Sequence, residues 1–187
     1  MELLAKIVLV VLLVLSVYFD LRIRKIPNKI TAPAALTGIV LGLILSGIDG
    51  LVFSGSGLLF GLLVFIIPYM LGGMGAGDVK LMAAIGALMG WEFTLRAALG
   101  TALVGGVMVI FYMLYKRQLG STLLKTVGLI LVPLAKGIYG RTFSPRVERF
   151  IRYFEKQKSI SNPTYIPYAV AIASGSMLVL LGAFGNF

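Results

Sequence analysis

Two aspartates, Asp20 and Asp78, are the residues of this 187-residue sequence whose type and position best suit chemistry. Each lies at one end of an apolar stretch, and ionisable groups in such positions are costly and usually functional. Two carboxylates that lie close together in a site of low dielectric constant share one proton. One of them can then accept a proton from water while the other donates one to a peptide carbonyl oxygen. The pair therefore predicts hydrolysis of the aspartic-protease type.

The rest of the composition excludes most other catalytic chemistry. The sequence has no cysteine and no histidine, which removes disulfides, Cys/His zinc sites, thiol nucleophiles and histidine-based triads. We therefore expect no metal and no cofactor. A structural explanation stays open for both aspartates, since each could cap a helix or pair with Arg22, Arg24 or Lys80. The other five acidic residues lie where water or basic side chains can solvate them: Glu2, Asp49, Glu92, Glu148 and Glu155.

The elements that must position the two aspartates are membrane helices. The sequence is 59% hydrophobic and 13% charged, whereas soluble domains are about 45–50% apolar and about 25% charged. We expect one all-α integral-membrane domain over residues 1–187, a bundle of about six transmembrane helices. The apolar stretches that predict these helices are 3–19, 30–48, 51–71, 79–91, 97–115 and 165–184.

The distribution of basic residues predicts the orientation. The net charge is +10, and Lys and Arg concentrate in segments 20–29 and 116–160. The positive-inside rule places both segments in the cytoplasm and both termini outside, in a multi-pass protein of the cell membrane. Segment 116–160 is expected to form an amphipathic loop on the bilayer surface, with lipids and not nucleic acid as its partner. Two spans separate Asp20 from Asp78, so both carboxylates are expected at the cytoplasmic boundary.

Glycine, with 23 residues, supplies two further predictions. The pairs Gly38/Gly42, Gly57/Gly61 and Gly86/Gly90 have the four-residue spacing that lets helix backbones approach closely in lipid. The stretch 72–77 is too rich in glycine for a regular helix and is expected to shape the site around Asp78. It is not a phosphate-binding loop, because Asp78 stands where that motif requires Lys.

Several short segments carry a family resemblance. Residues 75–81, Gly-Ala-Gly-Asp-Val-Lys-Leu, resemble the GxGD signature of the type IV prepilin peptidases, membrane aspartic proteases that include the archaeal preflagellin peptidases. Asp20-Leu21-Arg22 followed by Ile26-Pro27-Asn28 resembles the first catalytic segment of that family, and residues 165–169 are similar to the entrance of its last span. The resemblance implies catalytic roles for Asp20 and Asp78. It implies site-shaping or substrate-contacting roles for Gly75, Gly77, Lys80, Pro27 and Asn28.

The same resemblance implies the substrate. It would be a prepilin-like or preflagellin-like protein whose short cytoplasmic leader is cut just before a hydrophobic helix. Without cysteine, the chain resembles the short form of the family, as in tight-adherence pilus peptidases, and lacks the four-cysteine zinc site of members that also N-methylate the pilin. Two other classes stay open. The chain could be a small proton- or ion-coupled transporter with Asp20 and Asp78 as relay carboxylates, or a membrane scaffold without catalysis.

Overall fold

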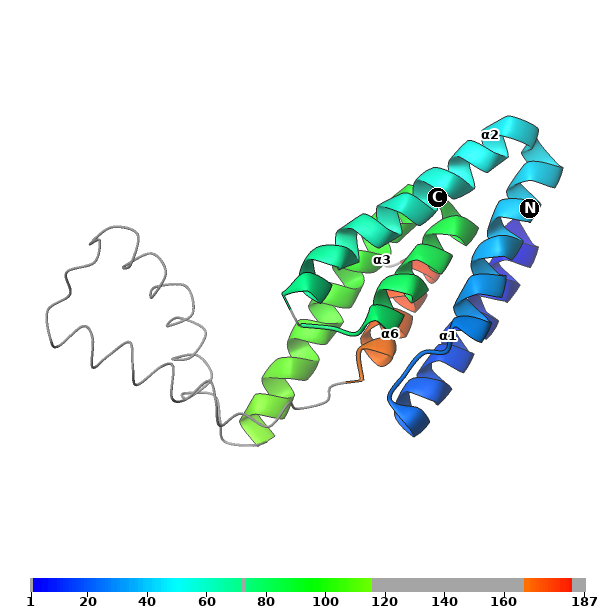
Figure 1. Cartoon of the computed structure of the whole chain (residues 1–187). Coiled ribbons are helices and arrows are strands. Elements are labelled where there is room, and N and C mark those ends of the chain that lie inside the picture. Colours follow the sequence, from blue (N-terminus) through cyan, green and yellow to red (C-terminus); the bar gives the residue numbers. More distant parts are fainter. Residues whose placement is uncertain (1, 72, 116–166, 183–187) are drawn as a thin grey trace, which may run out of the picture. The chain divides into compact units, whose positions relative to one another are not determined.

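The computed structural model describes residues 2–71, 73–115 and 167–182, and these are almost entirely helical (Figure 1). The helices are α1 (Glu2–Ile23), α2 (Asn28–Met70), α3 (Ala76–Tyr115) and α6 (Tyr168–Leu180). The chain divides into two compact units, residues 1–108 with 167–187 and residues 109–166. All four helices belong to the first unit except for the last turns of α3. The expected amphipathic segment 116–160 lies outside the described residues.

Three of the helices are long and apolar enough to cross a membrane, over Leu3–Ile23, Asn28–Met70 and Ala76–Tyr112. Helix α6 is a shorter apolar helix. Large apolar side chains cover the outside of the bundle, and Leu3 and Ile44, for example, are about three-quarters exposed at 75% and 73%. Such a surface suits lipid and not water. The all-α class is therefore confirmed, and the helices indicate a membrane protein.

Helix α2 reverses its direction at Gly47. Its 43 residues would extend about 65 Å if straight, roughly twice the apolar thickness of a bilayer. Gly47 adopts φ 60° and ψ −135° inside this helix, a conformation that glycine adopts without steric cost. Residues before and after Gly47 contact each other, since the Ser54 hydroxyl donates to the Gly38 carbonyl oxygen at 3.0 Å. A Cβ on Gly42 would lie 2.5 Å from the Gly50 carbonyl oxygen. The two halves of α2 therefore run antiparallel, and Figure 1 shows the turn at one end of the bundle.

Helix α3 is interrupted in a similar way, at Gly90 with φ 80° and ψ 175°. The expected spans 30–48 and 51–71 thus correspond to the two halves of α2, which ends one residue before Leu71, and the spans 79–91 and 97–115 fall within α3. The prediction of six separate helices is not confirmed, because the described residues form four. The difference arises because a single glycine outside helical φ/ψ interrupts each long helix where the hydropathy pattern predicted a connecting loop.

The halves of α2 pack against α3 through direct backbone contact. A Cβ on Gly57 would lie 2.1 Å from the Gly86 carbonyl oxygen, and one on Gly86 would lie 2.0 Å from the Gly57 carbonyl oxygen. One turn along, a Cβ on Gly61 would lie 2.4 Å from the Met82 carbonyl oxygen. These contacts leave no space for a methyl group. The prediction of close backbone packing is confirmed for these glycines, whereas a Cβ on Gly90 would meet the Phe53 ring and not a backbone.

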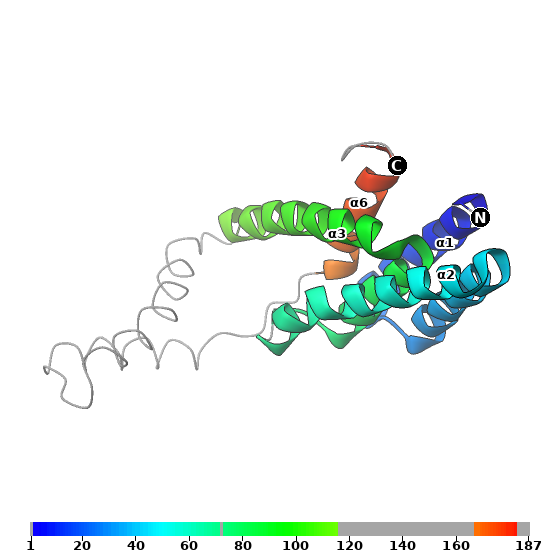
Figure 2. The ribbon, with the colours of Figure 1, turned by 90° about the horizontal axis from the view of Figure 1, so that it is seen from above.

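Helices α1 and α6 complete the bundle. Helix α1 packs against both α2 and α6, and Figure 2 shows α1 beside α2 from above. Helix α6 approaches α3 closely, since a Cβ on Gly175 would lie 2.4 Å from the Thr101 nitrogen. Among the described residues, Phe93 has the largest fully buried side chain, and Leu9, Leu81 and Ile172 share the same core. The core therefore draws on α1, α3 and α6, and α2 joins it through Ala34 and Phe65.

The contact between Gly57 and Gly86 can be tested with a substitution and its neighbour on the same helix. We expect Gly57→Ala to lower the free energy of unfolding by about 1–3 kcal/mol, because the added methyl group forces α2 and α3 apart. Gly55→Ala is the matched control, because a Cβ there would have no neighbour within 4 Å. Thermal unfolding in detergent measures both. Equal melting temperatures would contradict the view that backbone contact stabilises this pair of helices.

Candidate active site

Asp20 lies in the last turn of α1, where the helix ends at Ile23. The following residue, Arg24, has φ 55°, and its N–H donates to the Asp20 carbonyl oxygen at 2.9 Å. This hydrogen bond is the αL type of helix C-cap, a position that usually holds glycine because a side chain there is strained. The cap ends α1 and turns the chain toward α2. Asp20 is thereby placed at a hydrogen-bonded helix end, with a side chain that is only 5% exposed.

The carboxylate of Asp20 binds the start of a different helix. Its Oδ2 accepts the N–H of Ala169 at 3.2 Å, in the first turn of α6, whose N-cap residue is Pro167. The first N–H groups of a helix have no partner within the helix and carry partial positive charge. Asp20 therefore caps α6 and joins it to the end of α1. Ala169 is not among the predicted site residues, although Pro167, the N-cap residue of α6, is a sequence signal for a helix start two residues earlier.

Asp78 lies in the first turn of α3 and is also a capping residue. Its Oδ2 accepts the N–H of Gly75 at 3.0 Å, while its own N–H donates to the Gly75 carbonyl oxygen at 3.1 Å. Gly75 is the residue before α3, and Asp78 is the third residue of the helix. A side chain at the third position that accepts the N–H of the residue before the helix forms half of a capping box. The Asp78 side chain is 7% exposed. The structural explanation that the sequence left open, helix capping, thus applies to both aspartates.

The two aspartates come together at one end of the bundle. They are close enough for the charge of Asp20 to act on Asp78, and both side chains are buried. Ile26 lies in the connection between α1 and α2. A Cβ on Gly77, the residue before Asp78, would lie 3.0 Å from the Cβ of Ile26. The end of α1, this connection and the start of α3 therefore meet in one place.

The other predicted site residues lie around this meeting point. Pro27 is the N-cap residue of α2, and Asn28 is its first residue. The Lys80 ammonium group donates to the Asn28 side-chain oxygen at 2.9 Å, so it ties the first turns of α2 and α3 together. Gly75 supplies the N–H that Asp78 binds. Arg22, on the outer face of α1, donates to the hydroxyl of Tyr18 and lies over its ring.

Asp49 and Glu92, two further carboxylates, lie away from Asp20 and Asp78. Asp49 and Glu92 are exposed and lie two residues beyond the interruptions at Gly47 and Gly90. Within the described part of the chain, no group of three or more His, Cys, Asp or Glu side chains could hold a metal ion.

Two buried carboxylates within electrostatic reach of each other can act as acid and base toward one bound molecule.

Comparison with known proteins identifies one family. Residues 7–110, more than half of the chain, match the model of the type IV leader peptidase family. The matched range includes Asp20, the connection to α2, Asp78 and Lys80, and it ends before α6. No curated protein and no solved structure matches the chain.

The capping role of Asp78 predicts a difference between two substitutions. Asp78→Ala removes the acceptor of the Gly75 N–H and should lower the free energy of unfolding by about 1 kcal/mol. Asp78→Asn keeps a side-chain oxygen at the same position and should unfold close to the wild-type temperature. Thermal unfolding in detergent compares the two. If both variants melted together, the contact with Gly75 would not stabilise α3.

Proposed function

Because the chain belongs to the type IV leader peptidase family, we propose that it is an aspartic endopeptidase that removes the short leader of prepilin-like proteins. The observation that carries this proposal is that two buried carboxylates, at the end of α1 and in the first turn of α3, lie within electrostatic reach of each other. Asp20 and Asp78 are the proposed catalytic residues. Gly75, Gly77, Pro27, Asn28 and Lys80 are proposed to shape the site around them.

The proposed mechanism uses one proton shared by the pair. A water molecule between the carboxylates gives a proton to the ionised one, and its oxygen attacks the scissile carbonyl carbon. The protonated partner donates its proton to the carbonyl oxygen, which forms a tetrahedral diol. The diol then collapses: the aspartate that took the water proton passes it to the leaving nitrogen, a diol hydroxyl gives its proton to the other carboxylate, and the C–N bond breaks. The pair then shares one proton as it did at the start. Either aspartate can be the ionised one at the start.

The hydrogen bonds of the two carboxylates support this mechanism. In each aspartate, Oδ2 accepts a backbone N–H, from Ala169 or from Gly75. Such bonds hold the side chains in fixed orientations, and pre-set geometry of this kind supplies a large part of catalysis. Because both groups are buried, bulk water screens their charges weakly, so the pair acts strongly on a peptide bound between them.

We place the site at the cytoplasmic boundary of the membrane. The exposed basic residues Arg22, Arg24, Lys25 and Lys29 surround the connection between α1 and α2, and basic residues favour the cytoplasmic side. The reversal of α2 at Gly47 brings the chain back to this side before Asp78, so the proposed protein is multi-pass. A site at this depth suits a cleavage point between a water-exposed leader and an apolar helix.

The proposal predicts that each aspartate is essential. Asp20→Asn and Asp78→Asn should each reduce cleavage of a prepilin by about 10²–10⁴-fold, because the missing proton transfer is the chemical step. Asparagine keeps an oxygen acceptor for the backbone N–H groups, so both variants should fold. Asp49→Asn and Glu92→Gln, at exposed carboxylates, are the controls and should retain activity. The assay is leader removal by purified protein in detergent.

The outcomes distinguish the alternatives. Near wild-type cleavage by either asparagine variant would contradict the catalytic pair. A wild-type protein that leaves the leader intact but moves protons or ions across proteoliposomes would be the transporter. A protein with neither activity, in which both substitutions are silent, would be the scaffold.

The orientation can be tested with single cysteines, because the natural sequence has none. Lys25→Cys lies in the connection between α1 and α2, and Asp49→Cys lies beyond the turn of α2; both positions are exposed. A membrane-impermeant thiol reagent should label Asp49→Cys in intact cells and Lys25→Cys only after the cells are broken. The reverse pattern would place the site on the outer face.

A further inference from the structure

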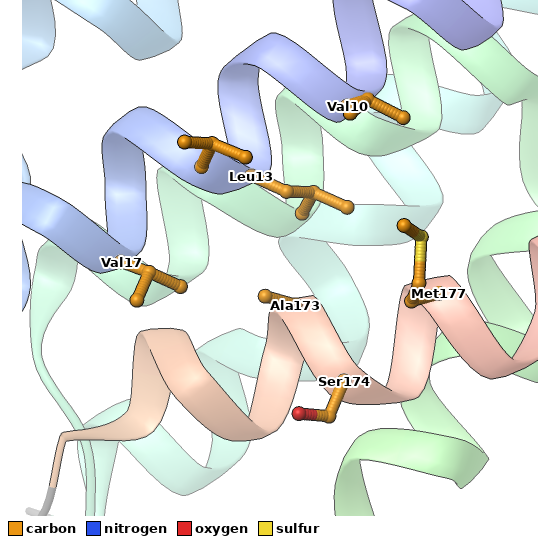
Figure 3. Close-up of a pocket in the computed structure, with 7 residues that line it drawn as sticks. Val10, Leu13, Val17, Ala173, Ser174 and Met177 are labelled. Carbon is orange, nitrogen blue, oxygen red and sulfur yellow. The ribbon is translucent and has the colours of Figure 1, made fainter.

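An apolar groove runs between α1 and α6 (Figure 3). Its volume is about 340 Å³, and its lining is Val10, Leu13, Val14 and Val17 of α1 with Ala173, Ser174 and Met177 of α6. The two helices are antiparallel here, since Val17 lies opposite Ala173 and Val10 lies toward Met177. No lining residue is charged, and Ser174 contributes the one side-chain hydroxyl.

One end of this groove leads to the proposed active site. Asp20 is three residues beyond Val17 on α1, and Ala169 is four residues before Ala173 on α6. The hydrogen bond from Ala169 to Asp20 therefore joins the two helices about one turn beyond the groove. From Val17 to Val10 the groove extends about 10 Å along α1, away from the carboxylates.

We propose that this groove binds the apolar helix of the substrate that follows the scissile bond, an inference that rests on the proposed function. The uncharged lining suits an apolar helix and not a polar leader, since burying charged or polar groups without partners is costly. The small side chains of Ala173 and Ser174 allow another helix to approach α6 closely, which is what favours helix association in lipid. With its helix in the groove, a substrate has its leader junction at Asp20.

A second groove on the other side of α1 provides a contrast. It has a volume of about 250 Å³ and lies between α1 and the first turns of α2; its lining includes Val11, Leu15, Pro33 and Lys29. An apolar helix in this groove would lie against Lys29, and burial of a charged residue is costly in a membrane. Val11 and Val14 thus form a matched pair on α1, with exposed fractions of 52% and 62%, one in each groove.

The first experiment compares Val14→Trp with Val11→Trp on two substrates in detergent. One substrate is a complete prepilin, and the other is a short peptide with the leader and the cleavage point but without the apolar helix. Val14→Trp fills the proposed groove and should raise KM for the complete prepilin roughly tenfold or more, the size expected for losing one or two apolar side-chain contacts. It should leave cleavage of the short peptide unchanged. Val11→Trp should match the wild type on both.

The second experiment uses cysteine cross-linking and does not depend on turnover. Val14→Cys and Val11→Cys are combined in turn with a prepilin that carries one cysteine in its apolar helix. A disulfide should form with Val14→Cys and not with Val11→Cys. This result decides the matter if Val14→Trp proves unable to fold.

The inference is overturned if the wild type cuts the prepilin but Val14→Trp has the same KM, or if both cysteines cross-link equally. The first result would show that the substrate helix does not occupy the groove. A wild-type protein that cuts neither substrate would instead overturn the proposed function itself, and this inference with it.

Discussion

Where α2 meets α3, the two backbones touch, because neither Gly57 nor Gly86 has room for a Cβ atom. Apolar side chains gain little from leaving lipid, so close van der Waals contact of this kind holds membrane helices together. The contact holds the returning half of α2 against the first half of α3. Together with the reversal at Gly47, it places the start of α3 at the same end of the bundle as the end of α1. The position of both carboxylates depends on it.

Helix capping and chemistry are not competing explanations for the two aspartates. Helix ends leave N–H groups without partners, and a buried helix end needs an acceptor other than bulk water. Asp20 and Asp78 satisfy such groups at the starts of α6 and α3. The same bonds fix the orientation of each carboxylate and hold it in a buried position. Helix capping is thus compatible with the acid–base role that we propose for the pair.

The two ends of the groove beside α1 differ in chemical character. At the end near the first turn of α6, the groove is followed by the Asp20 carboxylate and the backbone N–H of Ala169. The exposed basic residues of the connection to α2 come next along the chain after Asp20. Toward Val10 and Met177 the lining is apolar. A polypeptide that changes from polar to apolar along its length matches this gradient in one register only. In the proposed complex, the scissile bond would be positioned by the change from polar to apolar residues in the substrate, more than by the identity of the residues around the bond.

The residue types and their order predict the all-α class and the apolar helices, because hydropathy is a local property of the chain. Spacing along the chain likewise predicts the close glycine contacts and the choice of Asp20 and Asp78 as candidate catalytic residues. The expectation of six separate helices is not confirmed in the described residues, because the hydropathy pattern does not show that one glycine, Gly47 or Gly90, can replace a loop. The bond between Ala169 and Asp20 joins residues 149 positions apart, and the groove beside it belongs to two helices at once. Both depend on how whole helices pack against each other. Only the tertiary structure decides such packing, since it is set by backbone contacts that many distant residues make together.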